Sequence, residues 1–210
     1  MIRILLADDH TIFRQGLKAV IEKEHDLEVM QEAASGREAV SLAAKYEPDV
    51  VLLDISMPDT HGLDVLKQIR QTAPSIAILI LTMHPVAQYG LRGLRAGGSG
   101  YLTKDCEAAE LIAAIRKVSV GQMYISPALS ELITGNAFNR EGIAPHEILS
   151  DRELQILIMI ANGRRVKDIA DKLGVSPKTV STYRHRLLKK LHMADNEELC
   201  TYARNNELLD

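Results

Sequence analysis

Carboxylates stand at the ends of two apolar runs in this sequence, where they could take part in chemistry. Asp54 comes directly after residues 50–53, four branched apolar residues that predict a strand buried on both faces. Asp8 and Asp9 follow the apolar run 2–7 in the same way. Ligands of open α/β sheets bind at the carboxyl ends of the strands, so these acids are candidates for one site.

Such a site needs positive charge, because three carboxylates this close repel one another unless a cation holds them. Oxygen ligands of this kind suit Mg²⁺, which binds through one or two carboxylates plus phosphate oxygens. Thr82 and Lys104 end two further predicted strands and could contact a phosphoryl group on Asp54. The set therefore predicts phosphoryl transfer, with a carboxylate nucleophile, a metal, a hydrogen-bond donor and a point cation.

Each residue also has a plainer interpretation when it is taken alone. Asp8 or Asp9 fits the N-cap of the helix that follows, Thr82 an ordinary strand end, and Lys104 a solvated lysine. All five residues fall at the carboxyl ends of predicted strands, whereas chance would scatter them. The pattern as a whole favours the phosphoryl site.

A second candidate site is a cluster of positive charge near the C-terminus. The chain has a net charge of −3, yet residues 148–210 carry 11 basic and 9 acidic side chains. Within this part, residues 176–190 contain five cations and no acid. A basic helix on an otherwise acidic protein indicates contact with a polyanion, and a solvated helix face is the alternative.

The acidic site would be positioned by strands and helices that alternate over the first 120 residues. An α/β doubly wound, flavodoxin-like fold with a five-stranded parallel sheet is predicted. Its strands are expected at 2–7, 28–33, 50–53, 76–81 and 100–102, and its helices at about 11–24, 37–46, 63–72, 86–95 and 107–119.

The rest of the chain predicts a linker and a small all-α domain. Ser126 and Pro127 open a short helix, and residues 135–145 have the Asn, Gly and Pro content of a linker. Capping signals then predict four helices, at 150–162, 164–173, 176–191 and 197–206. We therefore expect a first domain at 1–120, a linker at 121–147 and a four-helix domain at 148–210.

Composition excludes several classes of protein. An apolar content of 46% with 25% charged residues is ordinary for a soluble globular protein. No apolar run approaches the roughly 20 residues of a membrane helix, and no signal peptide is evident. Cys106 and Cys200 lack disulfide-framework or zinc-ligand spacing. A cytoplasmic protein without membrane contact is expected.

Residues 2–119 resemble the receiver domain of two-component response regulators, and residues 148–206 resemble the LuxR-type helix-turn-helix, in the order of the NarL/FixJ family. The first resemblance lies in Asp8-Asp9, Asp54-x-x-Met57-Pro58 with Gly62, Thr82-Met83 and Gly100-Tyr101-Leu102-x-Lys104. The second lies in Leu149-Ser150-x-Arg152-Glu153, Ile169-Ala170, Leu173, Ser176-Pro177-Lys178-Thr179-Val180 and Lys190-Leu191. The run 176–184 is similar to the GacA/UvrY branch of the family.

The resemblance implies a transcription regulator that is controlled by phosphorylation. Asp54 would accept a phosphoryl group from a cognate sensor histidine kinase, and Lys104 would contact that group. Thr82 and Tyr101 would form the switch pair. The implied Mg²⁺ ligands are Asp8, Asp9, Asp54 and the backbone carbonyl of Ser56. The protein would not be an enzyme beyond its own phosphoryl transfer and slow dephosphorylation, and it would form a homodimer when phosphorylated or on double-stranded DNA.

The helix predicted at 176–191 would read DNA from the major groove. Val180, Tyr183, Leu187 and Leu191 repeat at helical spacing and should pack inward. The cations of the other face would grip phosphates, while Ser181, Thr182 and His185 would lie nearest the base edges. The predicted DNA contacts are Lys178, Thr179, Ser181, Thr182, Arg184, His185, Arg186, Lys189 and Lys190.

The chain also departs from the family pattern. Arg165-Val166 replaces a polar pair, Ser181 replaces a frequent lysine, and Asn196 replaces a common arginine. The first two changes bear on the target sequence more than on DNA binding itself.

Two glycines, Gly90 and Gly93, fall inside the helix predicted at 86–95, and each costs a helix about 1 kcal/mol relative to alanine. One hypothesis is that this helix is marginally stable and repacks when Asp54 is phosphorylated. A frayed surface helix without a regulatory role is the alternative.

Two other functions compete with this interpretation. A haloacid-dehalogenase-type phosphatase also uses a strand-end aspartate, but it needs a second acid where Ser56 stands. A regulator that senses a small molecule would need a pocket, for which two Phe, no Trp and no Gly-rich phosphate loop provide little material.

Overall fold

The computed structural model describes residues 1–57, 60, 62–138, 145–206 and 208–209. Two compact units make up the chain, Met1–Thr134 and Gly135–Asp210. Pro58, part of one predicted motif, and residues 139–144 of the predicted linker lie outside the described residues. Among the described residues, no helix combines the length and apolarity that crossing a bilayer requires.

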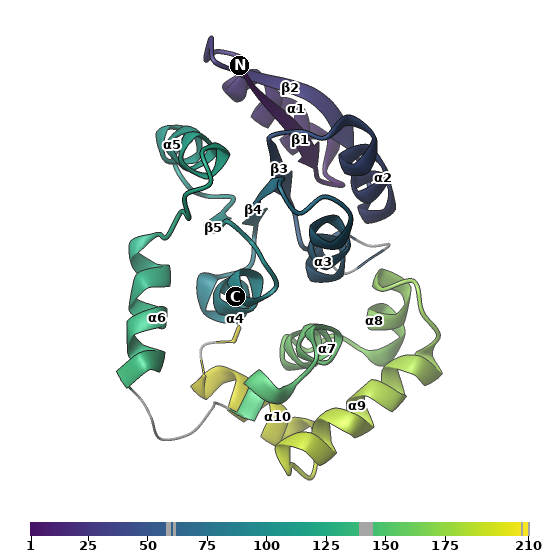
Figure 1. Ribbon diagram of the computed structural model, residues 1–210. Coiled ribbons are helices and arrows are strands. Elements are labelled where there is room, and N and C mark those ends of the chain that lie inside the picture. Colours follow the sequence, from purple (N-terminus) through teal and green to yellow (C-terminus); the bar gives the residue numbers. More distant parts are fainter. Residues whose placement is uncertain (58–59, 61, 139–144, 207, 210) are drawn as a thin grey trace. The chain divides into compact units, whose positions relative to one another are not determined.

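The first unit is built on a five-stranded, all-parallel sheet with the strand order β2-β1-β3-β4-β5 (Figure 1). This is the doubly wound, flavodoxin-like order that the sequence predicted. The strands are β1 (Ile2–Ala7), β2 (Leu27–Ala33), β3 (Val50–Leu53), β4 (Ala77–Thr82) and β5 (Gly100–Thr103). Every residue of β3 and β4 is buried, as expected for strands covered on both faces.

Helices cover both faces of this sheet. Leu17 and Ile21 of α1 and Leu111 and Ile115 of α5 join one apolar cluster with alternate residues of the strands. The helices α2, α3 and α4 lie on the opposite face (Figure 1). The helix bounds are α1 Thr11–Ile21, α2 Gly36–Tyr46, α3 Gly62–Thr72, α4 Val86–Arg95 and α5 Ala108–Ser119.

The predicted helix at 11–24 is shorter in the structure. It ends at Ile21, and Glu24 N donates to the carbonyl of Ile21 in the turn that leads to β2. The helices α2 to α5 begin and end within one residue of the expected positions. The helix that Pro127 opens continues to Phe138, so residues 135–138, which were expected to belong to the linker, are helical. Apolar periodicity is therefore a sufficient guide to the scaffold of the acidic site.

The chain after α5 continues along the first unit. Tyr124 forms a parallel bridge with Gly100 at the edge of β5, and Tyr124 N donates to the carbonyl of Ser99 at 2.8 Å. Leu129, in α6 (Pro127–Phe138), is fully buried. A Cβ added to Gly90 of α4 would lie 3.0 Å from Leu129 Cδ1, so the two residues are packed closely. The first residues of the expected linker at 121–147 thus pack on this unit. The domain limits at 120 and 148 stay a prediction.

The second unit contains the four predicted helices, preceded by a short 3-10 helix at Pro145–Ile148. Ser150 and Glu153 form the expected capping box at the start of α7. Gly174 has a φ of +62° in the turn between α8 and α9, a backbone conformation that favours glycine. The helices are α7 Asp151–Ala161, α8 Val166–Lys172, α9 Pro177–Leu191 and α10 Asn196–Asn205.

Candidate functional site

The three predicted carboxylates meet at the carboxyl ends of β1 and β3. These strands are neighbours, with Ala7 paired to Leu53, so Asp8 and Asp54 emerge side by side. Both are almost fully buried, at 4% and 2% exposure, whereas Asp9 is half-buried. One ligand atom from each of Asp8, Asp9, His10 and Asp54 lies within 4.8 Å of the others. The sheet topology thus creates the acidic pocket.

Lys104 supplies the positive charge of this pocket. Its backbone N–H donates to the carbonyl of Thr82 at 2.8 Å, which fixes the turn after β5 beside β4. Its Nζ lies 2.7 Å from Asp8 Oδ2 and 2.7 Å from Asp54 Oδ2, and its side chain is 3% exposed. Burial alone would lower the pKa of Lys104, but Asp54 and Asp8 outweigh that effect and hold it above its ordinary value.

The pocket fits a divalent cation. The Lys104 ammonium contacts Asp8 and Asp54, and Asp9 adds a third carboxylate, so negative charge is in excess among these groups. Asp9 Oδ1 is buried and has no hydrogen-bond partner among the described residues, although His10 Nδ1 lies 3.1 Å away in an orientation unsuited to a hydrogen bond. An orphaned carboxylate oxygen among other carboxylates is the donor set that Mg²⁺ prefers.

His10 belongs to the pocket although the sequence did not single it out. Its backbone N–H donates to Asp8 Oδ1 at 2.8 Å, and its ring Nδ1 lies 3.2 Å from the same oxygen. Its position directly after the acidic pair was the available signal. Ser56 donates its N–H to Asp54 Oδ1 at 2.9 Å, while the metal-binding role of its carbonyl stays a prediction.

The predicted switch residues, Thr82 and Tyr101, are both fully buried. Thr82 Oγ1 lies 3.3 Å from Ser56 Oγ and 3.4 Å from the backbone N of His84. The Tyr101 hydroxyl donates to the carbonyl of His84 at 2.8 Å. Both side chains therefore contact the loop between β4 and α4, which connects them physically.

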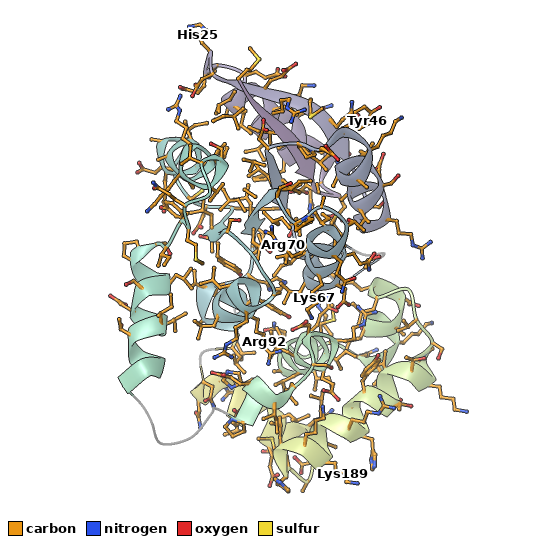
Figure 2. The ribbon with its side chains drawn as sticks, in the orientation of Figure 1. His25, Tyr46, Lys67, Arg70, Arg92 and Lys189 are labelled. Atoms are coloured by element: carbon orange, nitrogen blue, oxygen red, sulfur yellow. The ribbon has the colours of Figure 1, made fainter. Side chains whose placement is uncertain are left out.

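The second predicted site is α9, whose burial follows the expected pattern. Val180, Leu187 and Leu191 are buried, and Tyr183 is half-buried. Lys189 points away from the ribbon of α9 (Figure 2). The exposed predicted DNA contacts are Lys178, Ser181, Thr182, His185, Arg186, Lys189 and Lys190. Thr179 is half-buried, and its hydroxyl lies 2.8 Å from the hydroxyl of the N-cap Ser176.

Several predicted DNA contacts already have partners within the protein. Arg184 Nε donates to Asn196 Oδ1 at 2.6 Å, and Lys190 Nζ donates to Glu153 Oε2 at 2.7 Å. The hydroxyls of Ser181 and Thr182 donate to backbone carbonyls one turn earlier. Asn196, which departs from the family pattern, thus orients a cation of α9.

Family models match both units of the chain. Residues 4–116 match the response regulator receiver domain, and residues 147–203 match the bacterial regulatory proteins of the luxR family. The chain is 36% identical to the response regulator GacA of Pseudomonas aeruginosa, covering 100% of this chain and 99% of that protein. It is 36% identical to the response regulator UvrY of Escherichia coli K12, covering 97% and 94%. The similarity predicted from residues 176–184 therefore extends along the chain.

A solved structure is similar over both units as well. RcsB from Salmonella enterica serovar Typhimurium, bound to a promoter in the presence of phosphomimetic BeF3⁻, shares 25% identity with a TM-score of 0.60. The match covers 96% of this chain and 97% of that chain.

Proposed function

Because the chain belongs to the response regulators that join a receiver domain to a luxR-family domain, we propose that phosphorylation of Asp54 controls its binding to double-stranded DNA. The observation that carries this proposal is the pair of 2.7 Å contacts from Lys104 Nζ to Asp8 and Asp54. They support a pocket in which a nucleophilic carboxylate and a phosphoryl-binding cation are already in reach of each other.

The phosphoryl donor is a sensor histidine kinase. A carboxylate oxygen of Asp54 attacks phosphorus, the P–O bond forms, the P–N bond to the kinase imidazole breaks, and the leaving nitrogen takes up a proton. Lys104 and Thr82 then bind oxygens of the transferred group, since this chemistry depends mainly on positioning and charge neutralisation. Asp8, Asp9, Asp54 and the Ser56 carbonyl would hold Mg²⁺, which neutralises charge on the phosphoryl oxygens when it is bound.

The pocket is a switch rather than the site of a turnover reaction. It catalyses its own phosphoryl transfer and slow dephosphorylation, and Ser56 stands where a phosphatase of the haloacid-dehalogenase type would have its second acid. Thr82 and Tyr101 form the switch pair, and their shared contact with the loop at His84 supports this role.

The output is DNA binding by α9, whose exposed cations meet phosphates while Ser181, Thr182 and His185 lie nearest the bases. A homodimer, formed on phosphorylation or on DNA, would place two such helices about one helical turn, or 34 Å, apart. A protein with these partners works in the cytoplasm and needs no membrane contact.

The test is phosphorylation followed by footprinting. Wild-type protein incubated with acetyl phosphate and Mg²⁺ should gain one acid-stable, base-labile phosphate, and Asp54→Asn should gain none. Phosphorylated wild-type protein should then protect specific genomic sites that the Asp54→Asn protein protects weakly. Equal, sequence-specific footprints from both proteins would refute phosphorylation control, and repeated release of phosphate would indicate a phosphatase.

A further inference from the structure

An aromatic ring adjoins the ammonium of the acidic pocket. Lys104 Nζ lies 4.6 Å from the ring centroid of Phe13, which belongs to α1. This separation is within the range of a cation–π interaction, in which a ring face attracts a cation. Among the described residues, the ammonium therefore lies beside two carboxylates and one ring.

The two kinds of neighbour differ in what happens to them during phosphorylation. The carboxylates of Asp8 and Asp54 are the groups that a divalent cation and a phosphoryl group would engage. The ring of Phe13 is neutral and takes part in neither event, so its attraction for the ammonium persists. Lys104 carries its charge on a flexible four-carbon stem, which gains most from such a fixed contact.

The surroundings of the Phe13 ring favour a stable contact with the Lys104 ammonium. Phe13 packs against the apolar cluster shared by α1, α5 and the sheet, so its position is supported. Phe13 and Lys104 also line one cavity of about 400 Å³, whose other walls are largely apolar. A cation beside a ring in partly apolar surroundings is weakly screened by water, which strengthens the contact.

We infer that Phe13 is a positioning residue for phosphorylation, which holds the Lys104 ammonium at the pocket through its ring face. The inference rests on the proposed function of Asp54. A purely structural Phe13 would only fill space between α1 and the sheet. The two roles separate under substitution, because leucine keeps the apolar bulk without the ring face, whereas tyrosine keeps the face.

The experiment uses the full chain with Phe13→Leu, Phe13→Tyr and, as a matched control, Val20→Ala, which removes apolar bulk from the same cavity away from the ammonium. The first readout is the rate of phosphorylation by acetyl phosphate with Mg²⁺. Phe13→Leu should slow it about two- to thirtyfold, the rate equivalent of one cation–π contact. Phe13→Tyr and Val20→Ala should retain the wild-type rate.

The second readout does not depend on phosphorylation. In metal-free protein, the ring current of Phe13 should displace the NMR signal of the Lys104 ε-methylene protons, with Lys104→Arg used to assign that signal. The displacement should vanish in Phe13→Leu and remain in Phe13→Tyr. If Phe13→Leu fails to fold, as judged by circular dichroism, Phe13→Met takes its place.

A normal rate in Phe13→Leu, equal slowing in Phe13→Leu and Phe13→Tyr, or an unchanged lysine signal would each overturn the inference. Failure of the proposed function would look different, since wild-type protein would then gain no phosphate at Asp54 while the lysine signal still reported the ring contact.

Discussion

Lys190, in the last turn of α9, donates a 2.7 Å hydrogen bond to Glu153, in the first turn of α7. Glu153 is buried, and the same oxygen, Oε2, accepts from the backbone N and the hydroxyl of Ser150 at 2.8 and 3.0 Å. A residue expected to contact DNA is thus also part of the frame that holds α9 against α7.

Stability should depend on the charge of Glu153. Burial would raise its pKa, but the hydrogen bonds from Lys190 and Ser150 outweigh burial and hold it below the ordinary value of 4.5. The carboxylate therefore contributes stability above about pH 4.5, and that contribution disappears as pH falls through the lower pKa of the folded state. Glu153→Gln should lower the free energy of unfolding near pH 7 by about 1–3 kcal/mol.

The measurement is urea unfolding of wild-type and Glu153→Gln protein from pH 7 to pH 3.5. The difference between them should shrink as the pH falls. Glu197→Gln, on the exposed first turn of α10, is the control and should match wild type. A difference in unfolding free energy that stays constant with pH would show that the charge of Glu153 is not what stabilises the protein.

Removing the ammonium of Lys104 should destabilise the metal-free protein. Lys104→Met leaves the buried carboxylates of Asp8 and Asp54 without their cation, which costs about 3–5 kcal/mol when such a pair is broken. Added Mg²⁺ should raise the melting temperature of this variant more than that of wild type. Melting in EDTA and in Mg²⁺ tests both points.

The control for this prediction is Lys67→Met, which removes a half-exposed ion pair with Asp64. Such surface pairs are worth about 0–1 kcal/mol, so its melting should barely change. Equal melting of Lys104→Met and wild type in EDTA would show that the pocket does not need the ammonium.

Gly93→Ala should destabilise the protein despite the higher helix propensity of alanine. A Cβ at this position would lie 2.5 Å from Ile80 Cδ1, so the end of the Ile80 side chain must move. Ile80 is fully buried in the core, and we therefore expect a cost of about 1–3 kcal/mol. Close packing of α4 on the sheet is a second explanation for this glycine, beside the marginally stable helix that the sequence suggested. Ile80→Val removes the clashing carbon, so the double variant should be more stable than the sum of the single effects predicts.

Gly16→Ala provides the matched comparison in a helix with space. Nothing lies within 4 Å of a Cβ at Gly16, so this change should stabilise by up to about 1 kcal/mol. Urea unfolding of the four variants tests the packing explanation. Stabilisation by Gly93→Ala would contradict the packing explanation and favour the explanation from helix propensity.

Neighbouring lysines of α9 should differ in their effect on DNA binding. Lys189→Ala should weaken binding to all sequences and lower the slope of log affinity against log salt by about 0.9, with stability unchanged. Lys190→Ala should change the slope less and the stability more, because Lys190 is bonded to Glu153. Affinity of the phosphorylated protein at several salt concentrations, with unfolding of each variant, separates the two. Identical salt slopes for Lys189→Ala and Lys190→Ala would show that the two lysines contribute equally to DNA binding.

The scaffold and the acidic residues were accessible from the sequence because their signals are local. Continuous apolar runs predict β3 and β4. Parallel strands bring Asp8 and Asp54 to the same carboxyl-terminal edge of the sheet, independently of loop conformation. By contrast, the hydrogen bonds of Arg184 with Asn196 and of Lys190 with Glu153 join segments from different helices. No periodicity encodes such contacts, since they depend on how the helices pack.

The close approach of Phe13 to Lys104 is hidden in the sequence for the same reason. Phe13 lies within the helix predicted at 11–24, and nothing in that pattern indicates a contact with Lys104. Gly93 is a second example, because the sequence does not show that Ile80 of β4 occupies the space beside it.

The bridge between Tyr124 and Gly100 has a consequence for exchanging output modules between regulators. A chimaera joined at residue 120 would lose Tyr124, which pairs with the edge of β5, and Leu129, which packs beside Gly90. Bare sheet borders recruit strands from other chains, so such a chimaera should aggregate. A junction after Phe138, where α6 ends, keeps that cover and the whole of α6 in place, and is therefore the better point for recombining modules.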